Sequence, residues 1–73
     1  MHRFLIVVER AGRGYSAYSP DLPGCVATGQ THDEVTRRMF EAIQMHLQGM
    51  REDHLPVPKG RSSAEYVAVA AEG

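Results

Sequence analysis

The most informative segment of the sequence is Ser19-Pro20-Asp21-Leu22-Pro23-Gly24-Cys25-Val26-Ala27-Thr28-Gly29-Gln30-Thr31-His32-Asp33-Glu34. Each of its two prolines fixes its own φ at about −65° and moves the residue before it away from the helical conformation. Gly24 follows them and can adopt the positive φ that closes such a turn at little cost. We therefore predict a stiff turn between two strands, with Leu22 held in one place at its middle.

A long helix follows this turn, and its start is marked by a capping box. In that motif the hydroxyl of Thr31 accepts a hydrogen bond from an unpaired helix N–H, and Glu34 reaches back toward the cap. Asp33 and Glu34 also suit the positive end of the helix dipole. Apolar residues then recur at helical spacing, which predicts an amphipathic helix over about residues 32–51. The residues of this stripe are Val35, Met39, Ala42, Ile43, His46, Leu47 and Met50.

Four other segments have the composition of strands. Residues 4–8 are apolar on both faces, which is typical of a central strand, and residues 15–18 and 25–29 follow it. A connector rich in proline and glycine precedes the last strand, residues 66–71. The order β-β-β-α-β predicts an α+β fold. In this fold the first three strands form an antiparallel meander, and the helix covers one face of the sheet. A right-handed crossover then places the final strand beside the first and parallel to it.

The chain is short enough that its core is small. Its 73 residues make one domain, residues 1–73, and such a domain buries only about 60% of its unfolded surface. Cys25 is the only cysteine, so no internal disulfide forms, and no histidine pair has the spacing of a zinc site. Association with further copies is the remaining way to stabilise so small a scaffold.

The second face of the predicted sheet offers a surface for this association. The helix covers one face only, whereas Leu5 and Val7 of the first strand and Val67 and Val69 of the last strand place apolar side chains on the other. An open apolar face is typical of an association site. We therefore expect a homo-oligomer, a dimer or tetramer, with these four residues at its interface. The alternative is that they are half-exposed without a partner.

Charge and hydropathy limit the other partners. The net charge is −1 and the isoelectric point is about 6.4, whereas a nucleic-acid-binding domain usually carries a basic patch. We therefore expect no direct contact with nucleic acid. No apolar run is long enough to span a bilayer, and the first residues lack the pattern of a signal peptide. We expect a cytoplasmic protein that does not contact a membrane.

The sequence does not favour catalysis. No base with an orienting partner is evident among the four histidines. Cys25 with one of them is a possible nucleophile pair, but a small residue in a short strand explains this cysteine more simply. Phosphate-binding, dinucleotide-binding and zinc motifs are missing from the sequence. We expect no enzyme activity, no catalytic residue, no metal and no cofactor.

Several of these segments together resemble the HicB-like antitoxin family. The resemblance rests on the run from Tyr18 to Cys25, on Thr28 and Gly29, on Thr31 at the helix start and on the later Leu55-Pro56-Val57-Pro58. It implies a partial ribonuclease H-like β-β-β-α-β fold and a protein that binds and neutralises a HicA-type toxin, which cuts mRNA. Many members add a C-terminal DNA-binding domain, which we do not expect here. The alternative function is an orphan small oligomeric regulator or ligand-binding protein without a toxin partner.

The stiff turn is the candidate contact site for such a partner. Tyr15 and Tyr18 lie three apart on one strand, so they point to opposite faces and one of them is available to a partner. A rigid loop loses little entropy on binding, and we expect Tyr18, Asp21, Leu22 and Pro23 to contact the partner. In the alternative, Asp21 caps its own turn and Leu22 packs into the core.

Overall fold

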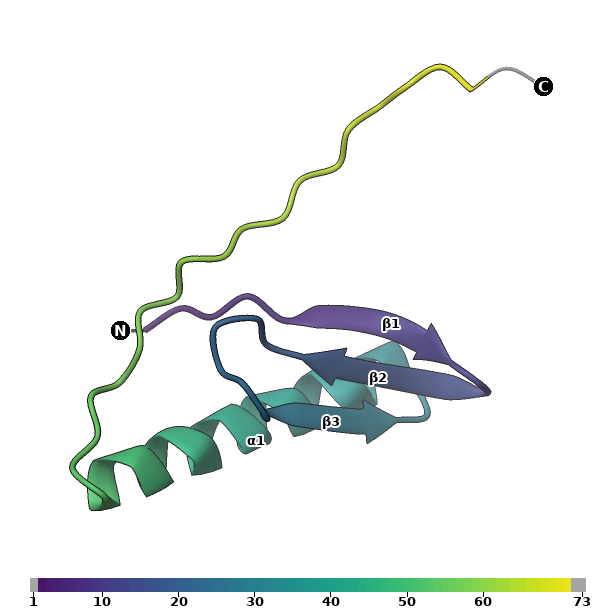
Figure 1. The fold of residues 1–73 in the computed structure, drawn as a ribbon. Coiled ribbons are helices and arrows are strands. Elements are labelled where there is room, and N and C mark those ends of the chain that lie inside the picture. Colours follow the sequence, from purple (N-terminus) through teal and green to yellow (C-terminus); the bar gives the residue numbers. More distant parts are fainter. Residues whose placement is uncertain (1, 72–73) are drawn as a thin grey trace.

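A computed structural model describes residues 2–71 and contains three strands and one helix. The strands are β1 (Val7–Ala11), β2 (Gly14–Tyr18) and β3 (Val26–Gly29), and the helix is α1 (His32–Glu52). The strands form one antiparallel sheet in the order β1-β2-β3. The helix lies across one face of this sheet (Figure 1). The predicted α+β class, with its meander and single long helix, is confirmed.

The first hairpin lies further along the chain than the sequence predicts. Its turn is at Gly12, which has a φ of +59°, and β1 pairs with β2 from Val7 opposite Tyr18 to Ala11 opposite Gly14. A strand over residues 4–8 was therefore wrong in its bounds. Position 7 is opposite the last residue of β2, so residues 4–6 have no β2 residue to pair with.

The core lies between the sheet and the helix. The predicted apolar stripe is confirmed, because Val35, Met39 and Leu47 are buried and the rest of the stripe is half-buried against them. Gly29 permits the close approach of β3 to the helix, since a Cβ there would lie 2.8 Å from the Val35 nitrogen. The buried apolar residues are Ala17, Leu22, Cys25, Val35, Met39 and Leu47.

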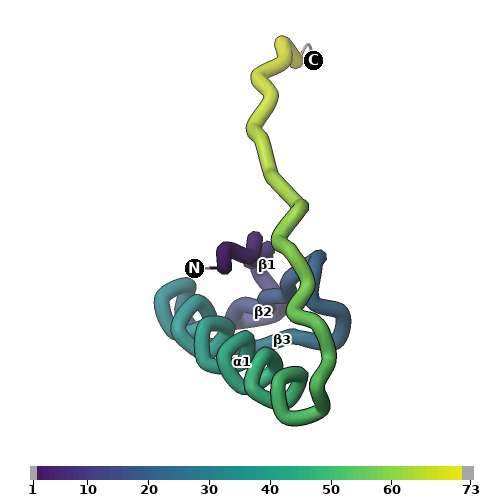
Figure 2. The backbone as a smooth tube through the Cα atoms, turned by 90° about the vertical axis from the view of Figure 1, so that its left-hand side faces the viewer, coloured from purple at the N-terminus to yellow at the C-terminus, as the bar shows by residue number. Residues whose placement is uncertain are grey.

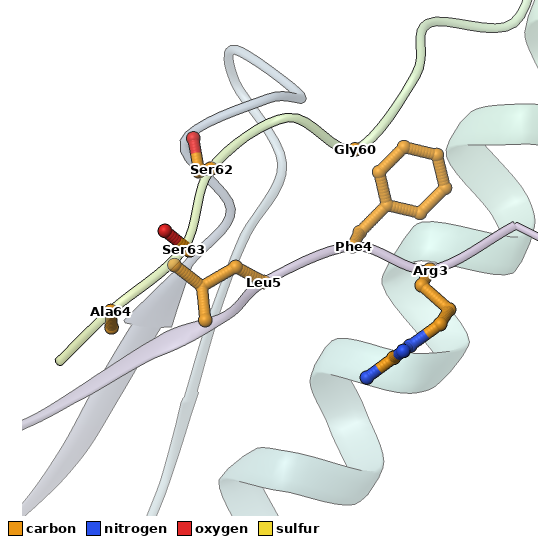
Figure 3. A pocket seen from close by; sticks show the side chains of 7 residues that line it. All are labelled: Arg3, Phe4, Leu5, Gly60, Ser62, Ser63 and Ala64. Atoms are coloured by element: carbon orange, nitrogen blue, oxygen red, sulfur yellow. The ribbon is translucent and has the colours of Figure 1, made fainter.

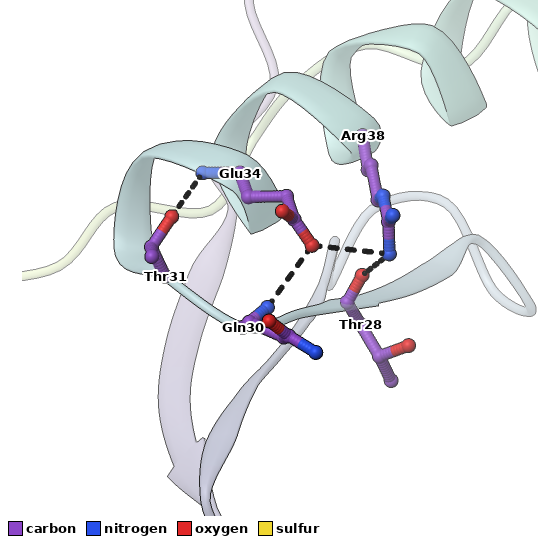
Figure 4. A network of polar contacts seen from close by, with 5 residues as sticks. All are labelled: Thr28, Gln30, Thr31, Glu34 and Arg38. Atoms are coloured by element: carbon purple, nitrogen blue, oxygen red, sulfur yellow. Dashed lines mark hydrogen bonds and ion pairs between the residues drawn. The ribbon is translucent and has the colours of Figure 1, made fainter.

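The helix begins as the capping box predicts, with one difference. Thr31 is the N-cap, and its Oγ1 accepts a hydrogen bond of 3.0 Å from the Glu34 N–H (Figure 4). The Glu34 carboxylate reaches back to the N–H of Gln30, at 3.1 Å, one residue before the cap. Arg38 joins this network through Glu34, at 3.4 Å, and the Thr28 carbonyl, at 3.0 Å. The network links the start of α1 to β3.

The chain after the helix contains no helix or strand among residues 53–71. We call residues 55–63 the connector and residues 64–71 the C-terminal arm. The connector returns to the body, where Val57 packs against the core. The arm then leads away from the sheet, as two perpendicular views show (Figures 1 and 2). Within residues 2–71 the expected fourth strand is unpaired, so β1 lies at a sheet edge rather than at the centre.

Candidate protein-binding surface

One row of apolar side chains crosses the face of the sheet opposite the helix. Val7 pairs with Tyr18 and Tyr18 pairs with Val26, so the three residues are neighbours across the strands. Ala17, the neighbour of Tyr18, is buried toward the helix, which places this row on the other face. Tyr18 is 42% exposed and Val26 is 65% exposed. We call these three residues the outer row.

A groove lies beyond the start of β1, between the first residues and the connector. It has a volume of about 480 Å³ and is lined on one side by Arg3, Phe4 and Leu5 and on the other by Gly60 and residues 62–64 (Figure 3). Leu5 is two residues before Val7, so it belongs to the same face as the outer row. The outer row therefore borders a groove that reaches the base of the C-terminal arm.

The turn between β2 and β3 is closed by its own backbone. The N–H of Ser19 bonds the Cys25 carbonyl at 3.4 Å, and the N–H of Cys25 bonds the Leu22 carbonyl at 3.0 Å. Gly24 has a φ of +84°, as the turn requires. Ser19 also donates its hydroxyl to the Leu5 carbonyl at 2.9 Å, which fixes the turn to the segment just before β1. Hydrogen bonds therefore hold the turn at both of its ends.

Leu22 is buried, whereas Asp21 is partly exposed and binds another segment of the chain. Leu22 is 1% exposed and belongs to the core, so for this residue the alternative interpretation holds. Asp21 does not cap its own turn. Its carboxylate accepts hydrogen bonds from the backbone N–H groups of Arg61 and Ser62 and from the Ser62 hydroxyl, each at 3.0 Å. The turn therefore anchors the connector, about 40 residues later in the chain.

The ionised form of Asp21 is favoured by this arrangement. The backbone N–H of Ser62 is the main cause that holds the pKa of the Asp21 carboxyl below its ordinary value of 3.8, and burial acts in the opposite direction. The Ser62 hydroxyl and the Arg61 backbone N–H lower the pKa further. Hydrogen bonds to a carboxylate are stronger than those between neutral groups. The anchor therefore depends on the charge of Asp21.

The structure places one residue of the expected partner-binding site next to one residue of the expected oligomer interface. Tyr18, expected to bind a partner, is directly opposite Val7, expected at the oligomer interface. Pro23 is exposed in the turn. Val67 and Val69, each 79% exposed, lie on the arm away from the sheet. They do not contact Leu5 and Val7 in this conformation.

Sequence reasoning missed Val26 and the connector as parts of this surface. The sequence predicts only that Val26 lies in a strand over residues 25–29, and its register with Tyr18 reveals the row. Period-2 alternation gives the face of a residue but not its cross-strand neighbour. Arg61 and Ser62 carried no local signal at all, because their partner is 40 residues away.

The geometry gives no activated nucleophile. Cys25 and His46 line one shallow pocket of about 210 Å³, but burial raises the pKa of the Cys25 thiol, whereas a nucleophilic thiol needs a lowered pKa. Among residues 2–71, no three His, Cys, Asp or Glu side chains are grouped as a metal site. Over the same residues, no helix is long and apolar enough to cross a membrane.

These features define a small α+β protein with one helix-covered sheet face and one uncovered apolar face. Residues 4–72 match the family described as HicB-like antitoxin of bacterial toxin-antitoxin system. The chain belongs to this family.

Similar proteins come from phage and bacteria. A 14.9 kDa protein of the rep-hol intergenic region of Haemophilus phage HP1 is 37% identical over 62 residues, 85% of this chain and 47% of that protein. A UPF0150 protein of Synechocystis is 32% identical over 60 residues, 81% of this chain and 76% of the relative. A UPF0150 protein of Helicobacter pylori is 39% identical over 49 residues, 67% of this chain and 68% of the relative. The chain spans about half the length of the phage relative, and no solved structure matches it.

Proposed function

We propose that this protein neutralises a HicA-type, RNA-cleaving toxin in the cytoplasm by direct protein contact. The observation that carries the proposal is the match of residues 4–72 to the HicB-like antitoxin family. In this role the protein needs neither catalysis nor a cofactor. Its net charge of −1 supports binding to a protein that is basic where it holds RNA, rather than to the RNA itself.

We place the toxin contact on the outer row and the adjoining turn. Tyrosine is among the residues most often found as energetic anchors of protein interfaces, and Tyr18 is at the centre of the row between Val7 and Val26. Pro23 lies exposed in this turn, which is held by backbone hydrogen bonds. Leu22 and Asp21 act indirectly, because Leu22 fixes the turn to the core and Asp21 holds the connector beside it.

Two further parts of the proposal concern assembly. The protein forms a homo-oligomer, and residues 66–71 form a fourth strand parallel to a β1 strand, either their own or that of another copy, which completes a partial ribonuclease H-like β-β-β-α-β fold. The groove supports the parallel direction. Gly60 packs against the Arg3 carbonyl, and residues 62–64 run beside Leu5 in the same direction as the first strand (Figure 3).

The test is binding of a HicA-type toxin encoded next to the gene for this chain. We expect the two proteins to co-purify and the antitoxin to restore growth of cells that express the toxin. Tyr18→Ala should weaken binding by at least about tenfold, or about 1.4 kcal/mol. Phe40→Ala is the matched control, because Phe40 is an aromatic residue on the helix with 62% exposure and should leave affinity unchanged.

Two other results would contradict the proposal or a part of it. If the two proteins do not bind and growth is not restored, the antitoxin proposal fails and the orphan regulator takes its place. If the proteins bind but Tyr18→Ala and Phe40→Ala have equal effects, the toxin contact lies elsewhere than on the outer row.

A further inference from the structure

The outer edge of β1 is an unused pairing site. In the sheet order β1-β2-β3, β1 has β2 on one side only, and among residues 2–71 no backbone group pairs with its other side. A strand edge of this kind, with free N–H and C=O groups, is a template for another strand. The five residues Val7–Ala11 contain no proline, and Val7 and Val8 favour strand pairing.

The C-terminal arm has the composition of the missing strand. Its sequence, Ala64 to Ala71, contains neither proline nor glycine, and it alternates so that Val67 and Val69 share one face and Tyr66 lies on the other. Tyr66 is fully exposed, and Val67 and Val69 are 79% exposed. Apolar β-forming side chains that remain in water over a whole segment indicate an interaction site.

The arm starts from a fixed base. Asp21 holds Arg61 and Ser62 by three hydrogen bonds, and a methyl group at Gly60 would clash with the Arg3 carbonyl. Residues 60–62 are therefore held against Arg3, just before β1, and against the turn that contains Asp21. Beyond Ala64 the arm departs from the body in both perpendicular views (Figures 1 and 2).

The arm is long enough to reach a neighbouring molecule. The radius of gyration is 14.8 Å, whereas a compact chain of this length has about 11 Å, and the longest dimension is 54 Å against 27 Å for the next. Eight extended residues span about 26 Å, and the five residues of β1 span about 17 Å. The arm of one copy can therefore cover the whole length of β1 in another.

We propose that the C-terminal arm of one copy pairs as a strand with the free β1 edge of a second copy, and that the second copy returns its arm in the same way. Each chain carries both the strand and the edge, so a two-fold exchange satisfies both at once and closes the assembly. The exchange also places Val67 and Val69 beside Leu5 and Val7 of the other copy. This dimer does not depend on the toxin.

The first experiment measures the dimer by sedimentation of the full chain without toxin. Val67→Pro removes a backbone donor and fixes φ in the arm, and it should raise the dimer dissociation constant by about a hundredfold or more. Val67→Thr is the matched control, since a β-branched residue with its N–H keeps the strand. It should change the constant by less than about fivefold. A dimer insensitive to Val67→Pro would overturn the proposal.

The second experiment identifies which chain supplies the strand. In an equimolar mixture of ¹⁵N-labelled and ¹³C-labelled chains, we expect nuclear Overhauser effects between residues 65–71 and residues 7–11 of differently labelled molecules. The same contacts within one molecule, in a monomer, would mean that the arm folds back on its own β1. That result, or an arm without contacts, overturns the exchange and leaves the toxin proposal untouched, because no toxin is present.

Discussion

The C-terminal arm, residues 64–71, has a higher share of apolar residues than the body of the molecule, residues 4–52, but it is the more exposed of the two. In the body, Val35 and Met39 are completely buried. In the arm, Val67 and Val69 are 79% exposed. Apolar composition therefore makes burial favourable but does not supply the surface against which a segment is buried.

The two kinds of secondary structure explain why these regions differ. The helix makes most of its backbone hydrogen bonds within its own 21 residues, and Thr31 caps its start. It therefore needs only one sheet face against which its apolar stripe can pack. A strand has no internal hydrogen bonds and exists only beside another strand. The arm therefore has no hydrogen bonds of its own that would hold it as a strand.

The largest expected effect on stability comes from comparing a leucine of the body with a leucine of the connector. Leu22→Ala should lower the free energy of unfolding by about 3 kcal/mol, as is usual when a buried leucine is truncated, because Leu22 is 1% exposed. Leu55→Ala, in the connector and at a residue that is 51% exposed, should cost less than about 1 kcal/mol. Urea denaturation at one protein concentration measures both. Equal losses would show that the connector is packed as tightly as the body.

A smaller effect tests whether the body is organised from the helix cap. Thr31→Ala removes the acceptor for the Glu34 N–H and should cost about 1 kcal/mol. Arg37→Ala, at an exposed helix position, should change stability by less than about 0.5 kcal/mol. Thermal unfolding followed by circular dichroism compares the two variants with the parent. The cap would be misplaced if both substitutions had the same effect.

The smallest effect on unfolding concerns the anchor that joins the two regions. Because the folded pKa of Asp21 is lowered from 3.8, its bonds to residues 61 and 62 are present above about pH 3.8 and are lost as the pH falls through the lowered pKa. Asp21→Asn should release these residues at neutral pH, with a smaller change in stability than Thr31→Ala causes. Amide exchange at Arg61 and Ser62 reports the release.

Asp33→Asn is the matched control for this measurement. Asp33 is an exposed aspartate in the first helical turn, so its substitution should leave the exchange of both amides unchanged. Protection that persists in Asp21→Asn, or that does not fall in acid, would show that the connector is held by packing and not by this carboxylate.

The elements that could be predicted from the sequence are those that depend on neighbouring residues. Two prolines and Gly24 fix the turn, Thr31 and Glu34 start the helix, and the apolar stripe selects the helix face that is buried. The antiparallel meander follows from short connections between strands. Each of these depends on backbone conformation or periodicity within a few residues, so the chain carries the information in one place.

The contacts between these elements, in contrast, follow from the tertiary structure. It placed Leu22 in the core, gave Asp21 to Arg61 and Ser62, and set Tyr18 between Val7 and Val26. It also left β1 at an edge and the arm outside the body. Hydrogen bonds across 40 residues and the register of neighbouring strands depend on which surfaces come together in space, and no local pattern in a single chain encodes that choice.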